Sequence, residues 1–203
     1  MTTRSRIHST ILFVFIVTAL AVSTVHASPQ SEELLPNPAA ESYLLSALQT
    51  DGYADLSEFP EGERNISGSA LTNALKDSQV QANSFIYIAN ITVVDSVYAN
   101  DLILPSNIQF SSVEFLADVD FNSSLLQAVA IVDSTFHGVA DFSFATFNGN
   151  ILMWSNTFGD LDFLRSTING NMSLSDNTIN GGLNFYAAHV TGELLLESSQ
   201  ILG

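Results

Sequence analysis

Large apolar side chains recur every five or six residues from residue 104 onward, and they form two interleaved series. The first series begins each of nine successive units of 10 or 11 residues: Leu104, Phe115, Leu125, Phe136, Phe147, Phe158, Ile168, Ile179 and Val190, followed by Ile201. The second series lies five or six residues later: Phe110, Phe121, Ile131, Phe142, Met153, Phe163, Leu174, Phe185 and Leu196. An amphipathic helix or a simple hairpin does not produce this spacing, which indicates an internal repeat.

Each apolar position has an inward partner two residues earlier, as in short strands whose side chains alternate between two faces. The partners of the second series are apolar: Ile108, Val119, Val129, Ala140, Ile151, Leu161, Met172, Leu183 and Leu194. The partners of the first series are small or polar: Ser123, Ser134, Ala145, Asn156, Ser166, Asn177, Ala188 and Ser199. Such strands bury their inner faces only when coils stack on one another. We therefore predict a β-solenoid.

Two units make one coil of 21 or 22 residues with four short faces, so equivalent residues lie about 4.8 Å apart. This register predicts that Phe142 stacks on Phe121 and Phe163. It also places four polar residues in one inner column, where side-chain amides bond along the stack: Ser134, Asn156, Asn177 and Ser199.

Three residues of the first series are each followed directly by an Asn-Gly pair, and we expect these pairs at corners that need a positive φ. They are Asn148-Gly149, Asn169-Gly170 and Asn180-Gly181. The alternative is a β-sandwich, which also places turns every 8 to 12 residues or so. A register kept over nine units favours the solenoid.

The stretches "FHGVADFSFATF" and "FLADVDF" resemble the Phe-rich branch of the pentapeptide-repeat proteins over about residues 102–203. This resemblance implies a right-handed, quadrilateral β-helix. The units of this chain alternate steps of five and six residues, whereas the family uses five and five. The expected fold class is thus all-β, a right-handed β-solenoid with a short N-terminal capping helix.

The chain before the repeats divides into three segments. Residues 1–27 have a charged start, an apolar run and small residues before Ala27, which predicts a signal peptide cleaved after Ala27. An uncleaved membrane anchor is the alternative, although the run is shorter than the roughly 20 residues that span a bilayer. Residues 28–36 are expected to be a polar linker and residues 37–80 a helix with a capping region.

The helix is predicted from Asn37 as N-cap, Pro38 at its first position and Gly52 as its stop. Its apolar stripe is expected to cover the open end of the solenoid: Ala40, Leu44, Ala47 and Leu48. The repeat domain is placed at 81–203. It ends without a polar cap, so we expect either a longer protein or an edge covered by another chain, with end-to-end self-association as one way to cover it.

Charge restricts the classes of partner. The 203 residues carry a formal net charge of −16, and residues 1–27 hold two of the five bases and none of the 21 acids. Binding to nucleic acid through phosphate contacts needs clustered bases and is not expected. The chain has no cysteine, so its stability must come from packing and not from disulfides.

No pattern of catalytic, cofactor-binding or zinc-binding residues is present, and we expect no enzyme and no cofactor. After residue 27 the only histidines are His137 and His189, and Arg165 is the only base in the repeats. A vertical row of Asp120, Asp141 and Asp162, 21 residues apart, is the candidate for a calcium site. Four sequons provide candidate glycosylation sites: Asn65, Asn90, Asn122 and Asn171.

These observations favour an exported, non-catalytic repeat scaffold, secreted or at the cell surface, that binds a protein or glycan partner. One alternative is an acidic DNA mimic that inhibits topoisomerases, as some pentapeptide-repeat proteins do. Another is a secreted β-helix protein that binds or degrades polysaccharide.

Overall fold

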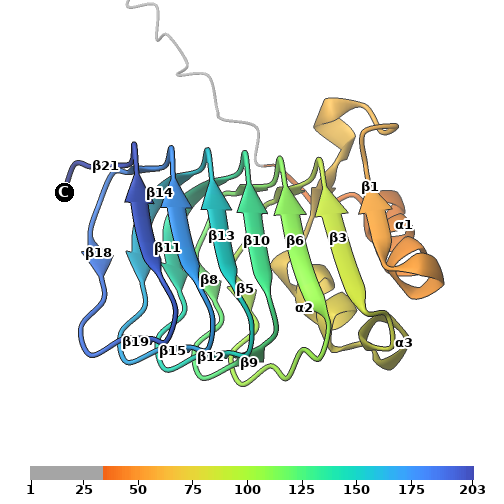
Figure 1. Cartoon of the computed structure of the whole chain (residues 1–203). Helices are drawn as coiled ribbons and strands as arrows, with labels where there is room; N and C mark the ends of the chain where they lie inside the picture. Colours follow the sequence, from red (N-terminus) through yellow and green to blue (C-terminus); the bar gives the residue numbers. More distant parts are fainter. Residues whose placement is uncertain (1–33) are drawn as a thin grey trace, which may run out of the picture. The chain divides into compact units, whose positions relative to one another are not determined.

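The computed structural model describes residues 34–203. The expected signal peptide and most of the linker lie outside the described residues. Residues 34–203 form one compact unit, in which short parallel strands stack coil on coil into a β-solenoid (Figure 1). The predicted all-β solenoid with an N-terminal helix is therefore confirmed.

Three parallel sheets run along the stack. The seven-stranded sheet contains, in order, β1 (Tyr53–Asp55), β3 (Phe85–Ala89), β6 (Asn107–Ser111), β10 (Val129–Val132), β13 (Ile151–Trp154), β16 (Met172–Ser175) and β20 (Leu194–Glu197). The ten-stranded sheet contains β2 (Asn65–Ile66), β4 (Thr92–Val93), β7 (Glu114–Phe115), β11 (Thr135–Asp141), β14 (Thr157–Asp162), β17 (Thr178–Ile179) and β21 (Gln200–Ile201), with β5 (Val97–Tyr98), β8 (Val119–Asp120) and β18 (Leu183–Asn184) paired beside them. The four-stranded sheet contains β9 (Leu125–Leu126), β12 (Thr146–Phe147), β15 (Thr167–Ile168) and β19 (His189–Val190).

The interior of the coils is filled by columns of aromatic and aliphatic side chains. Phe142 stacks on Phe121 at a centroid distance of 5.6 Å and on Phe163 at 5.2 Å, which confirms the predicted register. A second column, Phe115, Phe136 and Phe158, stacks at 4.5 and 4.9 Å. Offset aromatic pairs at these distances add about 0.5–1.5 kcal/mol each beyond the burial of their area.

The predicted inner polar column is also confirmed. The side-chain oxygen of Asn156 accepts a bond from the backbone N–H of Ser134 at 2.9 Å, and that of Asn177 accepts one from Asn156 at 2.9 Å. The amide nitrogens of Asn156 and Asn177 donate to the carbonyls of Ile131 and Met153, each at 2.8 Å. Because each amide bonds to backbone groups of neighbouring strands, these buried polar groups are satisfied without water.

One unit is in a different register from the predicted one. Leu126, not Leu125, is buried and pairs with Phe147, whereas Leu125 pairs with Thr146 and is exposed. Ser124 is accordingly the buried small residue of this unit, and Ser123 is exposed at a corner. Two successive leucines fit the apolar pattern equally well, so only the pairing of the coils distinguishes them.

The expectation for the Asn-Gly pairs was wrong, because none of them has a positive φ. Positive φ values occur instead at ten- or eleven-residue intervals, two residues after each member of the second series. These positions are Ser112, Ser123, Asp133, Phe144, Ser155, Arg165, Asp176, Ala187 and Ser198, and Asn90 and Asp101 continue the same interval before the series begins. The glycines are needed for space. A Cβ on Gly170 would lie 2.8 Å from the carbonyl oxygen of Gly149 in the coil below.

Helices close the N-terminal end of the stack (Figure 1). The predicted helix is α1 (Pro38–Asp51); the Asn37 side chain caps its start, and Gly52, at φ 76°, ends it. Its stripe of Ala40, Leu44 and Leu48 is buried, as expected for a lid. The rest of this region contains a 3₁₀ turn (Glu61–Glu63), α2 (Gly68–Lys76) and α3 (Ser78–Gln81).

Candidate binding face

The outer surface of the seven-stranded sheet lacks charge over most of its length, and we call it the neutral face. Its outward side chains are Tyr53 and Asp55 on β1, Phe85 and Tyr87 on β3, Asn107, Gln109 and Ser111 on β6, Ala130 and Val132 on β10, Leu152 and Trp154 on β13, Ser173 and Ser175 on β16, and Leu195 and Glu197 on β20. Only Asp55 and Glu197 are charged, and they lie on the two end strands. The five strands between them carry aromatic, aliphatic, hydroxyl and amide groups alone.

Aromatic rings stand on this face at two places. Tyr53 and Tyr87 stack with a centroid distance of 4.5 Å and an interplanar angle of 8°, and Phe85 lies on the same strand as Tyr87. Trp154, three strands further along, is 46% exposed, and its indole N–H donates to Asp176 at 2.9 Å. Exposed aromatic groups on a rigid sheet supply contact area at little entropic cost on binding.

A shallow trough of about 330 Å³ runs across the starts of β3, β6, β10 and β13 on the neutral face. Its lining includes Phe85 and Leu152, the small side chains of Ala128 and Ala130, and two amides, Asn107 and Asn150. The amide oxygens of Asn107 and Asn150 accept backbone bonds from the next coil, at 3.2 and 2.9 Å. These bonds fix both side chains, and no hydrogen bond within residues 34–203 uses their NH₂ groups. The trough therefore combines apolar walls with fixed donors.

The titrating groups at the β1 end of this face have shifted pKa values. Desolvation, together with the neighbouring Tyr87 and Asp55, raises the pKa of Tyr53, so its hydroxyl is neutral at physiological pH. Partial desolvation acts to raise the pKa of Asp55, but hydrogen bonds from Asn90 and Ser57 outweigh it and hold that pKa below its usual value. The single carboxylate on β1 therefore stays ionised at the end of the face.

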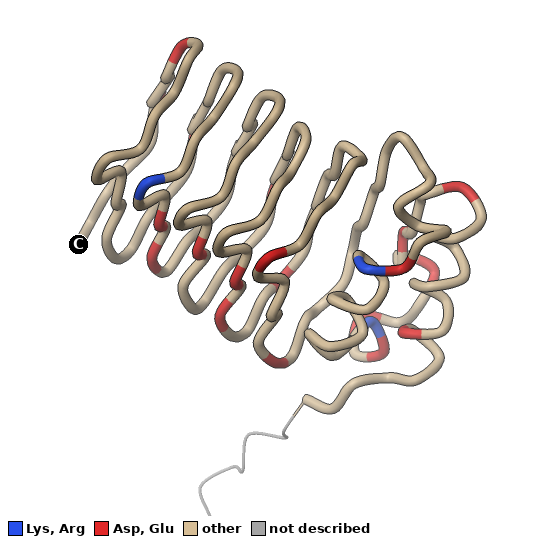
Figure 2. The backbone as a smooth tube through the Cα atoms, turned by 90° about the horizontal axis from the view of Figure 1, so that it is seen from below, with Lys and Arg blue, Asp and Glu red and all other residues tan. Residues whose placement is uncertain are grey.

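Acidic residues gather instead along another side of the stack (Figure 2). Asp120, Asp141 and Asp162 lie in register on the ten-stranded sheet, as the row expected from the sequence, and Asn184 continues it. Each carboxylate accepts a bond from the backbone N–H two residues later, at 2.7 to 2.8 Å: Asn122, Ser143 and Leu164. This bond closes the turn before each positive-φ corner, a role that the sequence pattern did not reveal.

No group of three or more His, Cys, Asp or Glu residues close enough to hold a metal ion occurs within residues 34–203. His137 is bonded to Glu114 at 2.9 Å, and the side chains of both are about half exposed. His189 is exposed and pairs with Thr167 in the four-stranded sheet. The guanidinium of Arg165 lies 5.8 Å from the centre of the Phe144 ring. The structure thus brings no catalytic constellation together around these residues.

The four sequon asparagines differ in their surroundings. Asn65 is buried, and its amide nitrogen donates to the carbonyl of Gly62 at 3.3 Å. Asn90 has a φ of 57°, and its amide donates to Asp55 at 2.8 Å. Asn122 is partly exposed and Asn171 is exposed, so these two are the more accessible acceptors in the folded chain.

Comparison of the chain with protein-family models, with curated proteins and with solved structures gives no match. Among the helices of the described part of the chain, none has the length and apolar character needed to cross a membrane. The function proposed below therefore depends on the geometry and chemistry of the surface.

Proposed function

We propose that this protein is an exported, non-catalytic repeat scaffold of the pentapeptide-repeat-like type, and that its neutral face binds an extended, uncharged polysaccharide. The observation that carries the proposal is the separation of charge. In a chain of net charge −16, five successive strands of one sheet have no charged outward side chain, and the acids nearest to them, Asp133 and Asp176, stand at the corners that follow β10 and β16.

The chemistry of the neutral face supports a carbohydrate partner. Sugar rings present C–H faces, which pack on aromatic side chains, and hydroxyl groups, which donate and accept hydrogen bonds. The neutral face offers both kinds of contact: the rings of Tyr87 and Trp154, and the amides of Asn107 and Asn150 at the starts of the strands, beside Phe85. Tyr87 and Trp154 lie on strands three steps apart, about 14 Å at the usual strand spacing, which suits a chain of several sugar units.

The neutral face is less well suited to a protein partner. Stable protein interfaces bury about 800 Å² on each partner and concentrate their energy in closely packed apolar pockets. The neutral face alternates small, polar and aromatic side chains over a flat sheet, an arrangement better suited to a flexible, hydroxylated chain. Its lack of charge favours an uncharged ligand, because an anionic polysaccharide would be repelled by the acidic chain.

The signal-peptide pattern of residues 1–27 supports export, and the exposed rings and fixed amides of the neutral face support a binding role. Mass spectrometry of the protein recovered from its host tests the first point. A mature N-terminus at Ser28 is expected, whereas a cytoplasmic product that begins at Met1 would contradict export.

Affinity electrophoresis tests binding, with gels that contain a soluble neutral β-glucan such as hydroxyethyl cellulose or an anionic polysaccharide such as alginate. The neutral gel should retard the protein, and alginate should not. Trp154→Ala and Tyr87→Ala should each weaken retardation by about tenfold in apparent affinity. Tyr186→Ala removes an exposed tyrosine outside the neutral face and serves as the matched control. Equal mobility of all four proteins in every gel would refute the proposal.

A further inference from the structure

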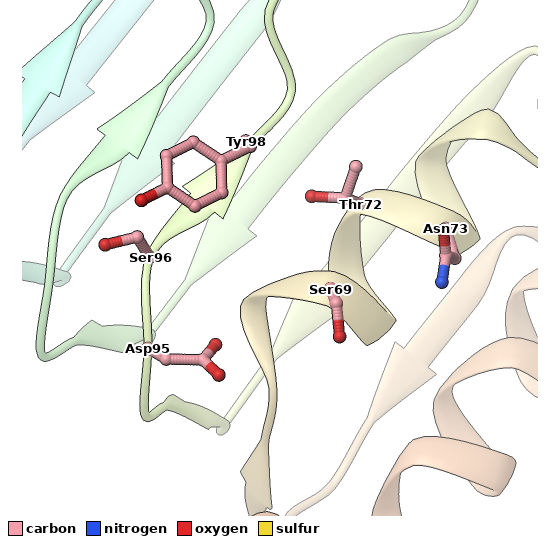
Figure 3. A pocket seen from close by; sticks show the side chains of 6 residues that line it. All are labelled: Ser69, Thr72, Asn73, Asp95, Ser96 and Tyr98. Carbon is pink, nitrogen blue, oxygen red and sulfur yellow. The ribbon is translucent and has the colours of Figure 1, made fainter.

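A second hollow lies apart from the neutral face, between α2 and the corner that leads into β5. Its volume is about 410 Å³, and it is lined by Ser69, Thr72, Asn73, Asp95, Ser96 and Tyr98 (Figure 3). This volume lies in the lower part of the 300–1,000 Å³ or so that small-molecule sites occupy, and a water molecule takes only about 30 Å³ of liquid. The hollow therefore has room for a small organic ligand.

The two walls of the hollow are fixed to each other. The backbone N–H of Gly68, at the start of α2, donates a hydrogen bond to a carboxylate oxygen of Asp95. A Cβ on Gly68 would lie 2.1 Å from the carbonyl oxygen of Ser96, so only glycine allows the helix to approach this closely. Leu71 and Leu75 are buried on the inner side of the same helix. The site is thus built into the fold and is not a gap between mobile loops.

Thr72 supplies an observation that points to a ligand. Its side chain is 8% exposed, and its hydroxyl has no hydrogen-bond partner within the described residues. In Figure 3 this hydroxyl points across the hollow toward the strand that carries Tyr98. A buried hydroxyl without a partner is unfavourable and calls for a particular explanation. Tyr98, 65% exposed, covers the opposite side and is the lining side chain with most freedom to move.

We propose that this hollow binds a single neutral sugar ring. The ring of Tyr98 would stack on the apolar face of the sugar, while the free oxygen of Asp95, the amide of Asn73 and the hydroxyl of Thr72 bond to its hydroxyl groups. The lining contains both donors and acceptors, which a polyhydroxylated ligand can use together. β5 belongs to the ten-stranded sheet, so the site is separate from the neutral face and does not depend on the function proposed above.

Other ligand classes fit the same lining less well. An anion would face the carboxylate of Asp95 without any Lys or Arg among the lining residues. The positive end of α2 is already neutralised by the bond from Gly68 to that carboxylate. An alkylammonium ion, quaternary or not, has no acceptor, so it would use Asp95 and the Tyr98 ring but could not accept a bond from the NH₂ group of Asn73.

Saturation-transfer NMR on the mature chain tests the inference, with neutral hexoses and N-acetylhexosamines as probes and tetramethylammonium as the competing class. At least one sugar should bind with a dissociation constant on the order of 1 mM. Tyr98→Ala should weaken that binding by about tenfold, and Thr72→Val, which keeps the shape but removes the hydroxyl, by about fivefold. Asp95→Asn retains an acceptor for Gly68 and should weaken sugar binding without unfolding the site.

Two controls keep the outcomes distinct. Tyr186→Ala removes an exposed tyrosine that lies in neither the hollow nor the neutral face, so its monosaccharide affinity should equal that of the parent protein. Thermal melts of all variants exclude global unfolding as a cause. The inference is overturned if no sugar binds at about 10 mM, if tetramethylammonium binds and the sugars do not, or if Tyr98→Ala binds sugar as well as the parent does.

Discussion

Asparagine inside an apolar solenoid is tolerated because its side chain replaces missing backbone partners. Asn156 accepts a bond from the N–H of Ser134 and donates to the carbonyl of Ile131, and Asn177 repeats this pattern one coil later. Each amide thereby joins neighbouring coils at a position where the strands of the sheets are interrupted. The column is structural, and Ser134, Asn156 and Asn177 are buried.

Asn156→Leu should destabilise the fold by about 2–6 kcal/mol, because the N–H of Ser134 and the carbonyl of Ile131 each lose the bond to Asn156, at roughly 1–3 kcal/mol each. Chemical denaturation gives the change in the free energy of unfolding. Asn148→Leu, at an exposed corner, is the control and should lie within about 0.5 kcal/mol of the parent. Equal values for the two variants would contradict the role of the column.

Phe142 lies in the middle of its column, stacked on one ring on each side. Phe142→Ala should lower the free energy of unfolding by about 3–5 kcal/mol, since coils held by backbone pairing cannot collapse into the cavity. Calorimetry measures the effect, and Phe144→Ala, at an exposed corner of the same coil, is the matched control. An unchanged melting temperature for Phe142→Ala would contradict the stacking.

At the scale of the element, corners are defined by hydrogen bonds from backbone N–H groups to aspartate side chains and by close backbone contact at glycines. Asp141 accepts a bond from the buried residue Ser143, and the following positive φ falls on Phe144. Glycine at the other corners lets successive coils approach without a Cβ between them. The chain therefore uses aspartate where the backbone turns and glycine where it is crowded.

Two variants of Asp141, in the acidic row, distinguish the effect of its charge from the effect of its hydrogen bond. Asp141→Ala should destabilise the corner by about 1–3 kcal/mol, because the buried N–H of Ser143 loses its partner. Asp141→Asn keeps an acceptor and removes one of three stacked charges, so it should be neutral or stabilising. Urea denaturation of both variants measures the two effects. If Asp141→Asn were as damaging as Asp141→Ala, the charge itself, for example as a cation ligand, would be needed.

Crowding between coils gives a second prediction for the corners. Gly170→Ala should destabilise the solenoid by about 1–3 kcal/mol, since the new Cβ would lie 2.8 Å from the backbone of Gly149 and the coils would have to separate. Gly62→Ala is the control, because nothing lies within 4 Å of its added Cβ. Thermal denaturation of both variants measures the difference, and equal melting temperatures would refute the crowding.

At the scale of the whole molecule, the stack separates an acidic side from a neutral one. The one contact between an acidic and a basic side chain within residues 34–203 is the half-exposed hydrogen bond between His137 and Glu114. Carboxylates on successive coils face one another about 4.8 Å apart with few bases near them. Repulsion along the stack therefore opposes folding, and packing of the core must exceed it.

Added salt should raise the melting temperature of the mature protein, because ions screen repulsion between exposed carboxylates once the Debye length falls to about 10 Å at 0.1 M. Calorimetry in sodium chloride from low to physiological concentration measures the trend. Polysaccharide binding by the neutral face should change little over the same range, since no charged group lies on its five central strands. A melting temperature that falls with salt would contradict the proposed balance of charges.

The sequence alone determined the period, the inward series and the inner polar column. These features depend on residues 21 or 22 positions apart, and in a solenoid the same separation puts residues in contact. The N-terminal helix followed equally directly from Asn37, Pro38 and Gly52, because capping is local. The row of aspartates was likewise placed correctly, although the turn that each one closes was not expected.

The tertiary structure decided the register of one unit, the positions of the positive φ values and the grouping of the outward side chains, none of which the periodicity determines. Leu125 and Leu126 fit the pattern equally, and the choice between them depends on pairing with Thr146 and Phe147. Positive φ falls on ordinary residues, because the backbone path of each corner is imposed by the stacked coils. The neutral face and the hollow beside Tyr98 were not predicted at all. Alternation states which residues point outward, but only the path of the coil and the docking of α2 determine which outward residues become neighbours.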